Sequence, residues 1–359
     1  MPATVLHGNC LDVLPNIPDG SVDAVVTDPP YGLSDITAKQ TVQALSAWLS
    51  GDRAFLPAAK GFMGRDWDGF VPPPAVFDEL LRVLKPGGHM AVFGSPRTMD
   101  LLGLSVRLAG FELRDTLAWL YGSGMPKTTQ LERQFAKRGD DGSAARFTSH
   151  ATGLRPGFEP ILLARKPFRG PALDNLVAHG TGALDIASTR IPFASDADKR
   201  ETTGKNRHGD FGTKHGANAV YGDYSMLGVR SNYDADGRWP SNVILNGDAA
   251  AQLDSQNPVN SVAQAGVSRF FYCARASAPE RPKASDGTAH VTVKPLALMS
   301  WMVDLVAPPG VAHILDPYAG SGTTGEAALR SGHDVTLIER EADFLPLIRV
   351  RLDRTSNAA

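Results

Sequence analysis

The sequence predicts an α/β fold in which a mainly parallel, doubly wound sheet is assembled in circularly permuted order, with an irregular insertion between its two parts. Three observations support this prediction. Short apolar strands alternate with helices over the first third of the chain. A glycine-rich loop of the nucleotide-binding type lies near the end of the chain instead of near its beginning. Between these parts, residues 139–289 are dense in Gly, Asn, Asp, Ser and Arg and have weak periodicity.

The front of the chain supplies most of the expected sheet. A strand over 23–27 is stopped by Asp28-Pro29-Pro30, and a helix over 74–84 starts at a proline and ends before Pro86-Gly87-Gly88. The other elements expected from the alternation are a strand at 89–93, a helix at 100–108, and strands at 112–121 and 159–164.

The tail of the chain contains too few elements to form a sheet by itself. We expect a helix at 296–305, a strand at 313–315, a helix at 323–330, a strand at 335–338 and a last helix at 342–352. Only 34 residues follow Gly325. The strands that complete the sheet must therefore come from the front of the chain, which is the reason for predicting a circular permutation.

Composition narrows the class of protein. Hydrophobic residues make up 42% and charged residues 21% of the 359 residues, as in ordinary globular proteins. We find no apolar run long enough for a membrane span, no secretory signal and no disulfide framework, and the two cysteines fit a cytoplasmic protein. The net charge is −4 over residues 1–126, +5 over 127–294 and −3 over 295–359. The basic excess in the middle suits contact with nucleic-acid phosphates, but a solvated surface is an equally good explanation of charge alone.

The glycine loop predicts a cofactor site. Gly320, Gly322 and Gly325 have the G-x-G-x-x-G spacing between a strand and a helix, and Ser321, Thr323 and Thr324 add hydroxyl donors. Glu339 ends the next strand, where an acid typically binds a ribose diol. Asp316 precedes the glycines, and a carboxylate there disfavours a pyrophosphate but suits an ammonium or sulfonium group. S-adenosyl-L-methionine carries both cations and a ribose, so it fits better than a nicotinamide dinucleotide.

The tetrapeptide Asp28-Pro29-Pro30-Tyr31 predicts the catalytic corner. It follows a strand, and ligands in open α/β sheets bind beyond the carboxyl ends of the strands. The Asp28 carboxylate and the Pro29 carbonyl can each accept one hydrogen from the amino group of a planar base. Tyr31 offers a stacking face for a base flipped out of the duplex. This chemistry requires no metal, and Cys10 and Cys273 lack the preceding proline that covalent C5-cytosine methylation usually uses.

The order of these motifs resembles the β class of amino-methylating DNA methyltransferases, and more closely the bacteriophage and prophage site-specific adenine methylases. Further stretches that carry the resemblance are 121–127, 154–160, 164–167, 180–184, 237–244, 271–276 and 290–295. The resemblance covers nearly the whole chain. It implies a Rossmann-like S-adenosylmethionine-dependent methyltransferase fold, with a catalytic part at 1–138, a target-recognition region at 139–289 containing one core strand near 159–164, and a cofactor-binding part at 290–359.

The resemblance also assigns residues. Asp28, Pro29, Pro30 and Tyr31 would form the catalytic motif. The cofactor residues would be Asn9, Cys10, Asp28, Thr292, Lys294, Asp316, Tyr318, Gly320, Ser321, Gly322, Thr323, Thr324 and Glu339. The family usually has Asp where this chain has Asn9, His-Pro where it has His290-Val291, and Phe where it has Tyr318. We expect these departures to be tolerated, with a weaker hydrogen bond to the cofactor adenine at Asn9.

Double-stranded DNA is the expected partner, and the family tends to form homodimers. Lys127, Arg155, Arg238 and Arg275 are the expected DNA contacts, and Phe62, Trp67 and Trp119 are candidates to line the base pocket or fill the gap in the duplex. No nuclease motif is visible, so the chain resembles the modification enzyme of a restriction–modification pair. The predicted reaction is methyl transfer to adenine N6. The alternatives are N4-cytosine methylation, methylation of an RNA base or a protein amide, and an inactive DNA-binding regulator.

Overall fold

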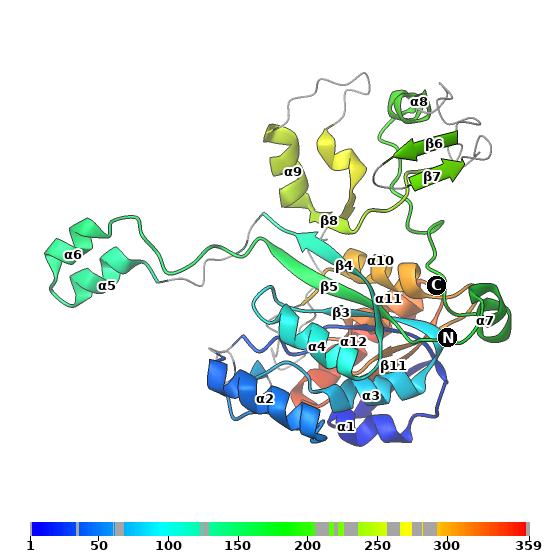
Figure 1. Ribbon diagram of the computed structural model, residues 1–359, viewed down its shortest axis with the longest axis horizontal. Helices are drawn as coiled ribbons and strands as arrows, with labels where there is room; N and C mark the ends of the chain where they lie inside the picture. The colour runs from blue at the N-terminus through cyan, green and yellow to red at the C-terminus, as the bar shows by residue number, and fades with distance from the viewer. Residues whose placement is uncertain are drawn as a thin grey trace.

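The computed structural model describes residues 2–33, 36–59, 61, 68–122, 124, 129–204, 215–218, 222–225, 236–256, 266–274, 282 and 293–356. Figure 1 shows a central sheet with helices on both faces, and smaller units from the middle of the chain that project away from it. None of the helices in these ranges is both long and apolar enough to cross a membrane.

The central sheet has nine strands in the order β1-β11-β10-β2-β3-β5-β4-β8-β9. All neighbouring strands are parallel except β5, which runs antiparallel to both β3 and β4. The strands are β1 (Ala3–His7), β2 (Val22–Thr27), β3 (Leu84–Phe93), β4 (Glu112–Leu120), β5 (Phe158–Arg165), β8 (Val243–Asn246), β9 (Tyr272–Ala274), β10 (His313–Asp316) and β11 (Asp334–Glu339). The expected mainly parallel α/β sheet is confirmed.

The head and tail of the chain interlock within this sheet. β1 pairs with β11, and β10 lies between β11 and β2, with Leu315 opposite Val25. The sheet is therefore completed by strands from both ends, as the short tail predicts. All the parallel strands from β1 to β3 end at the same edge, so the residues that follow them in sequence come together there.

Two helical layers bury the faces of the sheet. One face packs on α1 (Cys10–Val13), α2 (Ala38–Ser50), α3 (Pro74–Val83) and α4 (Met99–Leu108), and the other on α10 (Leu296–Val306), α11 (Thr323–Arg330) and α12 (Leu345–Ser356). Alternate residues of β2 pack against the two layers: Val25 faces the first, and Ala24 and Val26 face the second. All three are fully buried. The apolar run in this strand is thus explained by burial on both sides.

The middle of the chain forms the projecting units. One is an arm in which α5 (Leu131–Lys137) packs on α6 (Asp141–Arg146), well away from the sheet (Figure 1). Because β4 ends and β5 begins at the edge that carries Asp28, this arm leaves the sheet beside the catalytic corner. The remaining elements are α7 (Ala172–His179), α8 (Asp196–Gly204), the hairpin of β6 (His215–Asn218) and β7 (Gly222–Ser225), α9 (Gly247–Gln256), and the 3-10 turns η1 (Leu14–Asn16), η5 (Val267–Phe270) and η6 (Ala342–Phe344).

The structure adds elements that the sequence patterns did not predict. β5 occupies the position expected for the core strand of 139–289, but β8 and β9 from the same stretch extend the sheet beyond β4. They are only four and three residues long, too short for a periodicity signal. The predicted last helix is divided into η6 and α12, and β1 and α2 were not predicted.

Candidate active site

The Asp28 corner is held by contacts from two other segments, one at 68–70 and one at Thr98. The backbone N–H groups of Tyr31 and Gly32 donate to one oxygen of Asp68, at 2.8 and 3.0 Å. The Thr98 hydroxyl donates to the Tyr31 carbonyl at 2.6 Å. Gly32 has φ +63°, and a Cβ there would lie 3.1 Å from the backbone of Phe70, so only glycine fits without strain. Asp68 and Thr98 are supporting residues that the sequence analysis missed.

Four side chains converge at this corner. Lys294 donates to Asp28 Oδ2 at 2.6 Å, and its ammonium lies 3.3 Å from Glu159 Oε2. The Tyr31 hydroxyl lies 2.7 Å from Asp28 Oδ1 and 2.9 Å from Glu159 Oε2. We call Asp28, Tyr31, Glu159 and Lys294 the corner cluster. Asp28 and Tyr31 follow β2, Glu159 lies at the start of β5, and Lys294 precedes α10, so only the fold brings them together.

The corner cluster is partly buried, and this changes the pKa of two of its members, Lys294 and Tyr31. Lys294 is 8% exposed. Burial alone would lower the pKa of Lys294, but the carboxylates of Asp28 and Glu159 outweigh it and raise that pKa, so the ammonium stays charged. Burial is the largest cause, and the negative charges of Asp28 and Glu159 are the next. Together they raise the pKa of Tyr31 well above its ordinary value, so the phenol stays protonated.

Asp316 joins the tail to this corner. The Thr27 hydroxyl donates to its Oδ1 at 2.7 Å, and the Thr324 hydroxyl donates to its Oδ2 at 2.6 Å. Burial raises the pKa of Asp316 to about 6, against the lowering effect of these hydrogen bonds and of one from the Tyr318 N–H. The hydroxyls of Thr27 and Thr324 and the Tyr318 N–H are neutral donors, so a cationic ligand group placed beside this buried carboxylate would be favoured.

The glycine loop and Glu339 form the second half of the predicted cofactor site. Glu339 accepts the Gly320 N–H at 2.7 Å through one oxygen and the Glu341 N–H at 2.8 Å through the other. Gly322 has φ +80°, and a Cβ there would lie 3.2 Å from the Ile348 backbone. The loop therefore lies close against α12, and its glycines hold the turn open toward the edge where β10 and β11 end.

The N-terminal residues of the predicted cofactor site lie beside this loop. Gly8 N–H donates to the Glu339 carbonyl at 3.0 Å, which fixes the start of α1 next to the end of β11. Cys10 is buried and its thiol lies 3.4 Å from the Tyr318 hydroxyl. The Asn9 side-chain oxygen accepts from the Leu11 N–H at 3.1 Å and so caps α1. The structure thus gathers Asn9, Cys10, Tyr318 and Glu339 from opposite ends of the chain.

The residues present fit a sulfonium-containing amino acid with an attached nucleoside. Asp316 offers a buried carboxylate to a cation, Glu339 offers acceptors to a diol, and the loop at 320–324 allows close backbone approach. Among the described residues, no group of three or more His, Cys, Asp or Glu side chains is arranged to hold a metal ion.

The predicted DNA contacts are placed in different environments. Arg155 is exposed and donates to the Gly122 carbonyl near the end of β4. Lys127, Arg275, Thr292, Phe62 and Trp67 lie outside the described residues. Trp119 is 9% exposed, packs 5.4 Å from the Tyr121 ring, and pairs with Glu159 across the sheet, so it lies next to the corner cluster.

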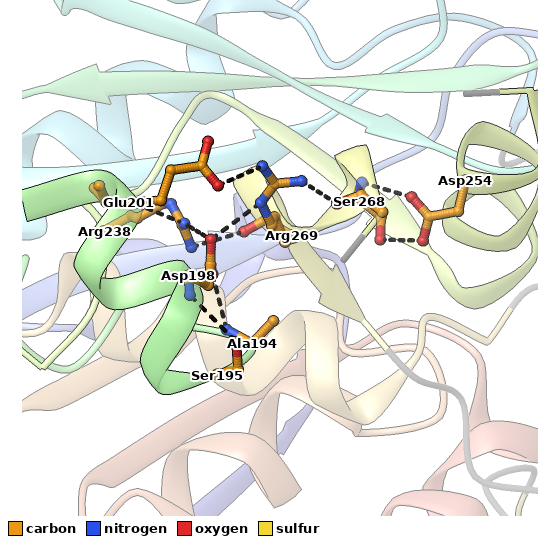
Figure 2. A network of polar contacts seen from close by, with 10 residues as sticks. Ala194, Ser195, Asp198, Glu201, Arg238, Asp254, Ser268 and Arg269 are labelled. Atoms are coloured by element: carbon orange, nitrogen blue, oxygen red, sulfur yellow. Dashed lines mark hydrogen bonds and ion pairs between the residues drawn. The ribbon is translucent and has the colours of Figure 1, made fainter. Parts of the chain in front are cut away.

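Arg238 is held in a buried polar network. It donates to Asp198 at 2.5 Å, and Arg269 donates to the same oxygen at 3.0 Å (Figure 2). Burial is the largest single influence and raises the pKa of Asp198. The hydrogen bonds from Arg238 and the Ala194 N–H, together with the charges of Arg238 and Arg269, outweigh it, so the net pKa is lowered. A second pair, Asp254 with Ser268 at 2.6 Å, ties α9 to η5. This arrangement favours Arg238 as a structural clamp of the recognition region.

Comparison with known proteins identifies the family. The model of the N6_N4_Mtase family, described as DNA methylase, matches residues 22–349. The chain belongs to this family of DNA methyltransferases. The match includes β2, the Asp28 corner, Lys294, the glycine loop and Glu339.

Two curated relatives support the same assignment. The chain is 27% identical over 196 residues to the Type II methyltransferase M.HindIII of Haemophilus influenzae, which covers 50% of this chain and 63% of that enzyme. It is 24% identical over 354 residues to the DNA adenine methyltransferase YhdJ of Escherichia coli K12, which covers 99% of this chain and 84% of that enzyme.

Solved structures of similar fold include two further methyltransferases. M1.HpyAVI has a TM-score of 0.47 and 14% identity, with 98% of each chain covered. PvuII DNA methyltransferase, titled as cytosine-N4-specific, has a TM-score of 0.49 and 12% identity, with 99% of this chain and 91% of that chain covered. Structures titled as complexes with S-adenosyl-L-methionine, or SAM, are also among the matches.

Glu159 and Thr27 are the site residues that the sequence analysis did not single out for function. Glu159 is the second residue of β5 and comes just before the apolar run of that strand. It also lies within a stretch that carries the family resemblance. An acid at the start of a buried strand is itself a signal, because burial of a carboxylate requires a partner. Thr27 gave no such signal, because a threonine in a strand is ordinary.

Proposed function

We propose that this protein is a site-specific DNA methyltransferase that transfers a methyl group from S-adenosyl-L-methionine to N6 of an adenine flipped out of double-stranded DNA. The observation that supports this most directly is the 2.7 Å hydrogen bond between Thr27 and Asp316, because it places the Asp28 corner next to the buried carboxylate of the cofactor loop. S-adenosylmethionine is the cofactor of the family.

Each half of the site has a distinct task. Asp316 would hold the cationic methionine end of the cofactor, with the loop at 320–324, Tyr318 and the neighbouring Thr292 and Lys294. Glu339 would bind the ribose, and Asn9 and Cys10 would border the adenine. Bound S-adenosylmethionine supplies an electrophilic methyl group. The chain's own contribution is to orient the base amine toward that group and to keep water away from it.

The Asp28 corner would hold and activate the amine. Asp28 and the Pro29 carbonyl accept its two hydrogens, which draws the nitrogen lone pair out of conjugation with the ring. Held in this way, the nitrogen would present its lone pair to the methyl group that the cofactor supplies, and the Asp28 carboxylate would be the acceptor for the proton that the amine loses. Tyr31 provides a face for the flipped base.

Adenine is the preferred target because Asp28 begins the corner, and YhdJ carries the adenine assignment in its name. N4-cytosine methylation is the second candidate, because it uses the same geometry and PvuII methyltransferase carries that assignment. Exposed Arg155, together with Lys127 and Arg275, is proposed to contact DNA, and a homodimer remains a prediction from the resemblance.

The test is to express the chain in a bacterium that lacks DNA methylation. Single-molecule sequencing of its genome should reveal one modified sequence motif, and nucleoside analysis of the same DNA should yield N6-methyladenine. If the analysis yields N4-methylcytosine instead, the second candidate function, N4-cytosine methylation, replaces the adenine assignment. No modified base, in a strain that produces folded and cofactor-binding protein, would favour an inactive DNA-binding regulator.

A further inference from the structure

Each oxygen of the Asp28 carboxylate already faces one donor within the protein. Its Oδ1 faces the Tyr31 hydroxyl at 2.7 Å, and its Oδ2 accepts from the Lys294 ammonium at 2.6 Å. The proposed function, on which this inference rests, requires the same carboxylate to accept a hydrogen from the base amine. A carboxylate oxygen can accept a second hydrogen bond, but the amine hydrogen would then share its oxygen with Tyr31 or Lys294. The amine is bound most strongly where one of these two donors moves away from Asp28.

A second acceptor is already in place for both donors. Glu159 Oε2 lies 2.9 Å from the Tyr31 hydroxyl and 3.3 Å from the Lys294 ammonium. A phenol has a single hydroxyl hydrogen, so Tyr31 can donate to only one of the two carboxylates at a time. An ammonium has three N–H groups and can turn from one carboxylate to the other without leaving its site.

Burial makes this second acceptor necessary. The Lys294 side chain is 9% exposed, and it forms ion pairs with Asp28 and Glu159. A buried ammonium that loses its only carboxylate is strongly destabilised. If Glu159 were absent, Lys294 would hold on to Asp28 and compete with the incoming amine.

The backbone fixes Glu159 for this task. It lies on β5 opposite Trp119 of β4, and the following residues of β5 pair with β3 on the other side. A residue near the start of a strand that is hydrogen-bonded on both edges has little freedom to move. Its backbone is therefore fixed at a position from which the carboxylate is within reach of both donors.

We propose that Glu159 is a positioning residue that receives the Tyr31 hydroxyl and the Lys294 ammonium when the target amine takes over the Asp28 carboxylate. The exchange moves hydrogen bonds only and breaks no covalent bond. Glu159 thus acts through Tyr31, Lys294 and Asp28, and the exchange would operate in the same way for an adenine or a cytosine amine.

The first experiment compares Glu159→Gln with the matched variant Glu112→Gln. Glu112 also lies on the sheet and forms an ion pair, with Arg165 at 2.6 Å, but at the far end of β5. The amide keeps the shape of Glu159 but cannot balance the ammonium. We expect Glu159→Gln to lower kcat/KM on unmethylated DNA about 10-fold or more, as loss of a charged hydrogen bond does, while Glu112→Gln stays near wild type.

The second experiment tests the exchange itself by removing a competing donor. Tyr31→Phe keeps the stacking face but frees Asp28 Oδ1, so Glu159→Gln combined with Tyr31→Phe should have a higher kcat/KM than Glu159→Gln alone. Base entry is followed without cofactor by the fluorescence of 2-aminopurine placed next to the target base, which keeps its own amino group, in the motif found by genome sequencing. The fluorescence gain should fall in Glu159→Gln and recover in the double variant.

Two results would overturn the proposal: wild-type kcat/KM in Glu159→Gln, or no recovery in the double variant. If Glu159→Gln melts at a lower temperature than Glu112→Gln, the Glu159→Asp variant is used in its place. Aspartate keeps the charge but withdraws the carboxylate by one methylene. An unchanged kcat/KM in Glu159→Asp would also overturn the proposal. If the wild-type enzyme forms N4-methylcytosine, only the adenine assignment is refuted. The comparison of the Glu159 variants can then be made with formation of that product.

Discussion

Thr27 and Asp316 are 289 positions apart in the sequence and are joined by a hydrogen bond of 2.7 Å at the shared edge of β2 and β10. One residue precedes the catalytic corner and the other precedes the glycine loop. The contact therefore measures how closely the head and tail of the chain meet, which is the condition for methyl transfer between the two halves of the site.

Replacing Thr27 with Val should weaken cofactor binding. The hydrogen bond from Thr27 lowers the pKa of Asp316, so its loss should raise that pKa above about 6 and reduce the ionised fraction near neutral pH. We expect the Kd for S-adenosylmethionine at pH 7 to rise about 10-fold, measured by calorimetry. Thr27→Ser, which keeps the hydroxyl, should bind nearly as wild type; equal affinity of the Val and Ser variants would contradict the role of this contact.

Replacing Asp316 with Asn should separate stability from binding. The folded-state pKa of about 6 is above the ordinary 3.8, so the native state holds a proton that the unfolded chain releases. The free energy of unfolding contributed by this group therefore falls as pH rises from about 4 through 6, by roughly 3 kcal/mol in total. Asp316→Asn should be more stable than wild type at pH 7 and no more stable at pH 4, yet should lose cofactor binding. Denaturant unfolding at both pH values checks this, and a pH-independent difference would contradict it.

Replacing Asp28 with Ala should abolish transfer and leave cofactor binding nearly intact. The variant loses the acceptor of the amine, while Lys294 keeps Glu159 as a partner at 3.3 Å and stays paired. We expect kcat to fall by at least about 100-fold. The measurement pairs a tritiated methyl-transfer assay with calorimetric cofactor binding. Near-normal turnover would refute the role of Asp28.

Replacing Gly322 with Ala should destabilise the cofactor half of the site. Gly322 has φ +80°, and the added Cβ would lie 3.2 Å from the Ile348 backbone. We expect a loss of about 1–2 kcal/mol in the free energy of unfolding, from backbone strain and overpacking. Gly142→Ala is the matched control, since Gly142 lies in α6 and a Cβ there meets its nearest atom at 3.7 Å. It should be neutral or stabilising.

Replacing Arg238 with Met distinguishes a clamp from a DNA contact. The change leaves buried Asp198 with Arg269 as its remaining ion-pair partner (Figure 2), and we expect destabilisation by about 3 kcal/mol. Hydrogen exchange of α8 and η5 should then increase. Lys199→Met, which removes an exposed pair with Asp236, should change stability by less than about 1 kcal/mol. Weaker DNA binding with unchanged exchange would instead identify Arg238 as a DNA contact.

Much of the site was predictable because its residues are consecutive. Asp28 to Tyr31 and Gly320 to Gly325 are local motifs whose prolines and glycines encode backbone shape, so the sequence alone indicates a turn beyond a strand in each case. The supporting contacts were not predictable in this way. Asp68, Thr98 and Glu159 reach the corner from separate elements, and nothing in their local sequence gives a distance to Asp28.

The sequence by itself determined the alternating α/β pattern, the permuted order and the two motifs, because hydrophobic periodicity and backbone restrictions act over a few residues. The tertiary structure decided which strands are neighbours and therefore which charges meet. Only the packing of β10 between β2 and β11 places Asp316 beside Thr27, and only the pairing of β5 with β3 and β4 gives Lys294 and Tyr31 a second carboxylate. The physical reason is that electrostatic and hydrogen-bonding partners are chosen by distance in space, which separation along the chain does not specify.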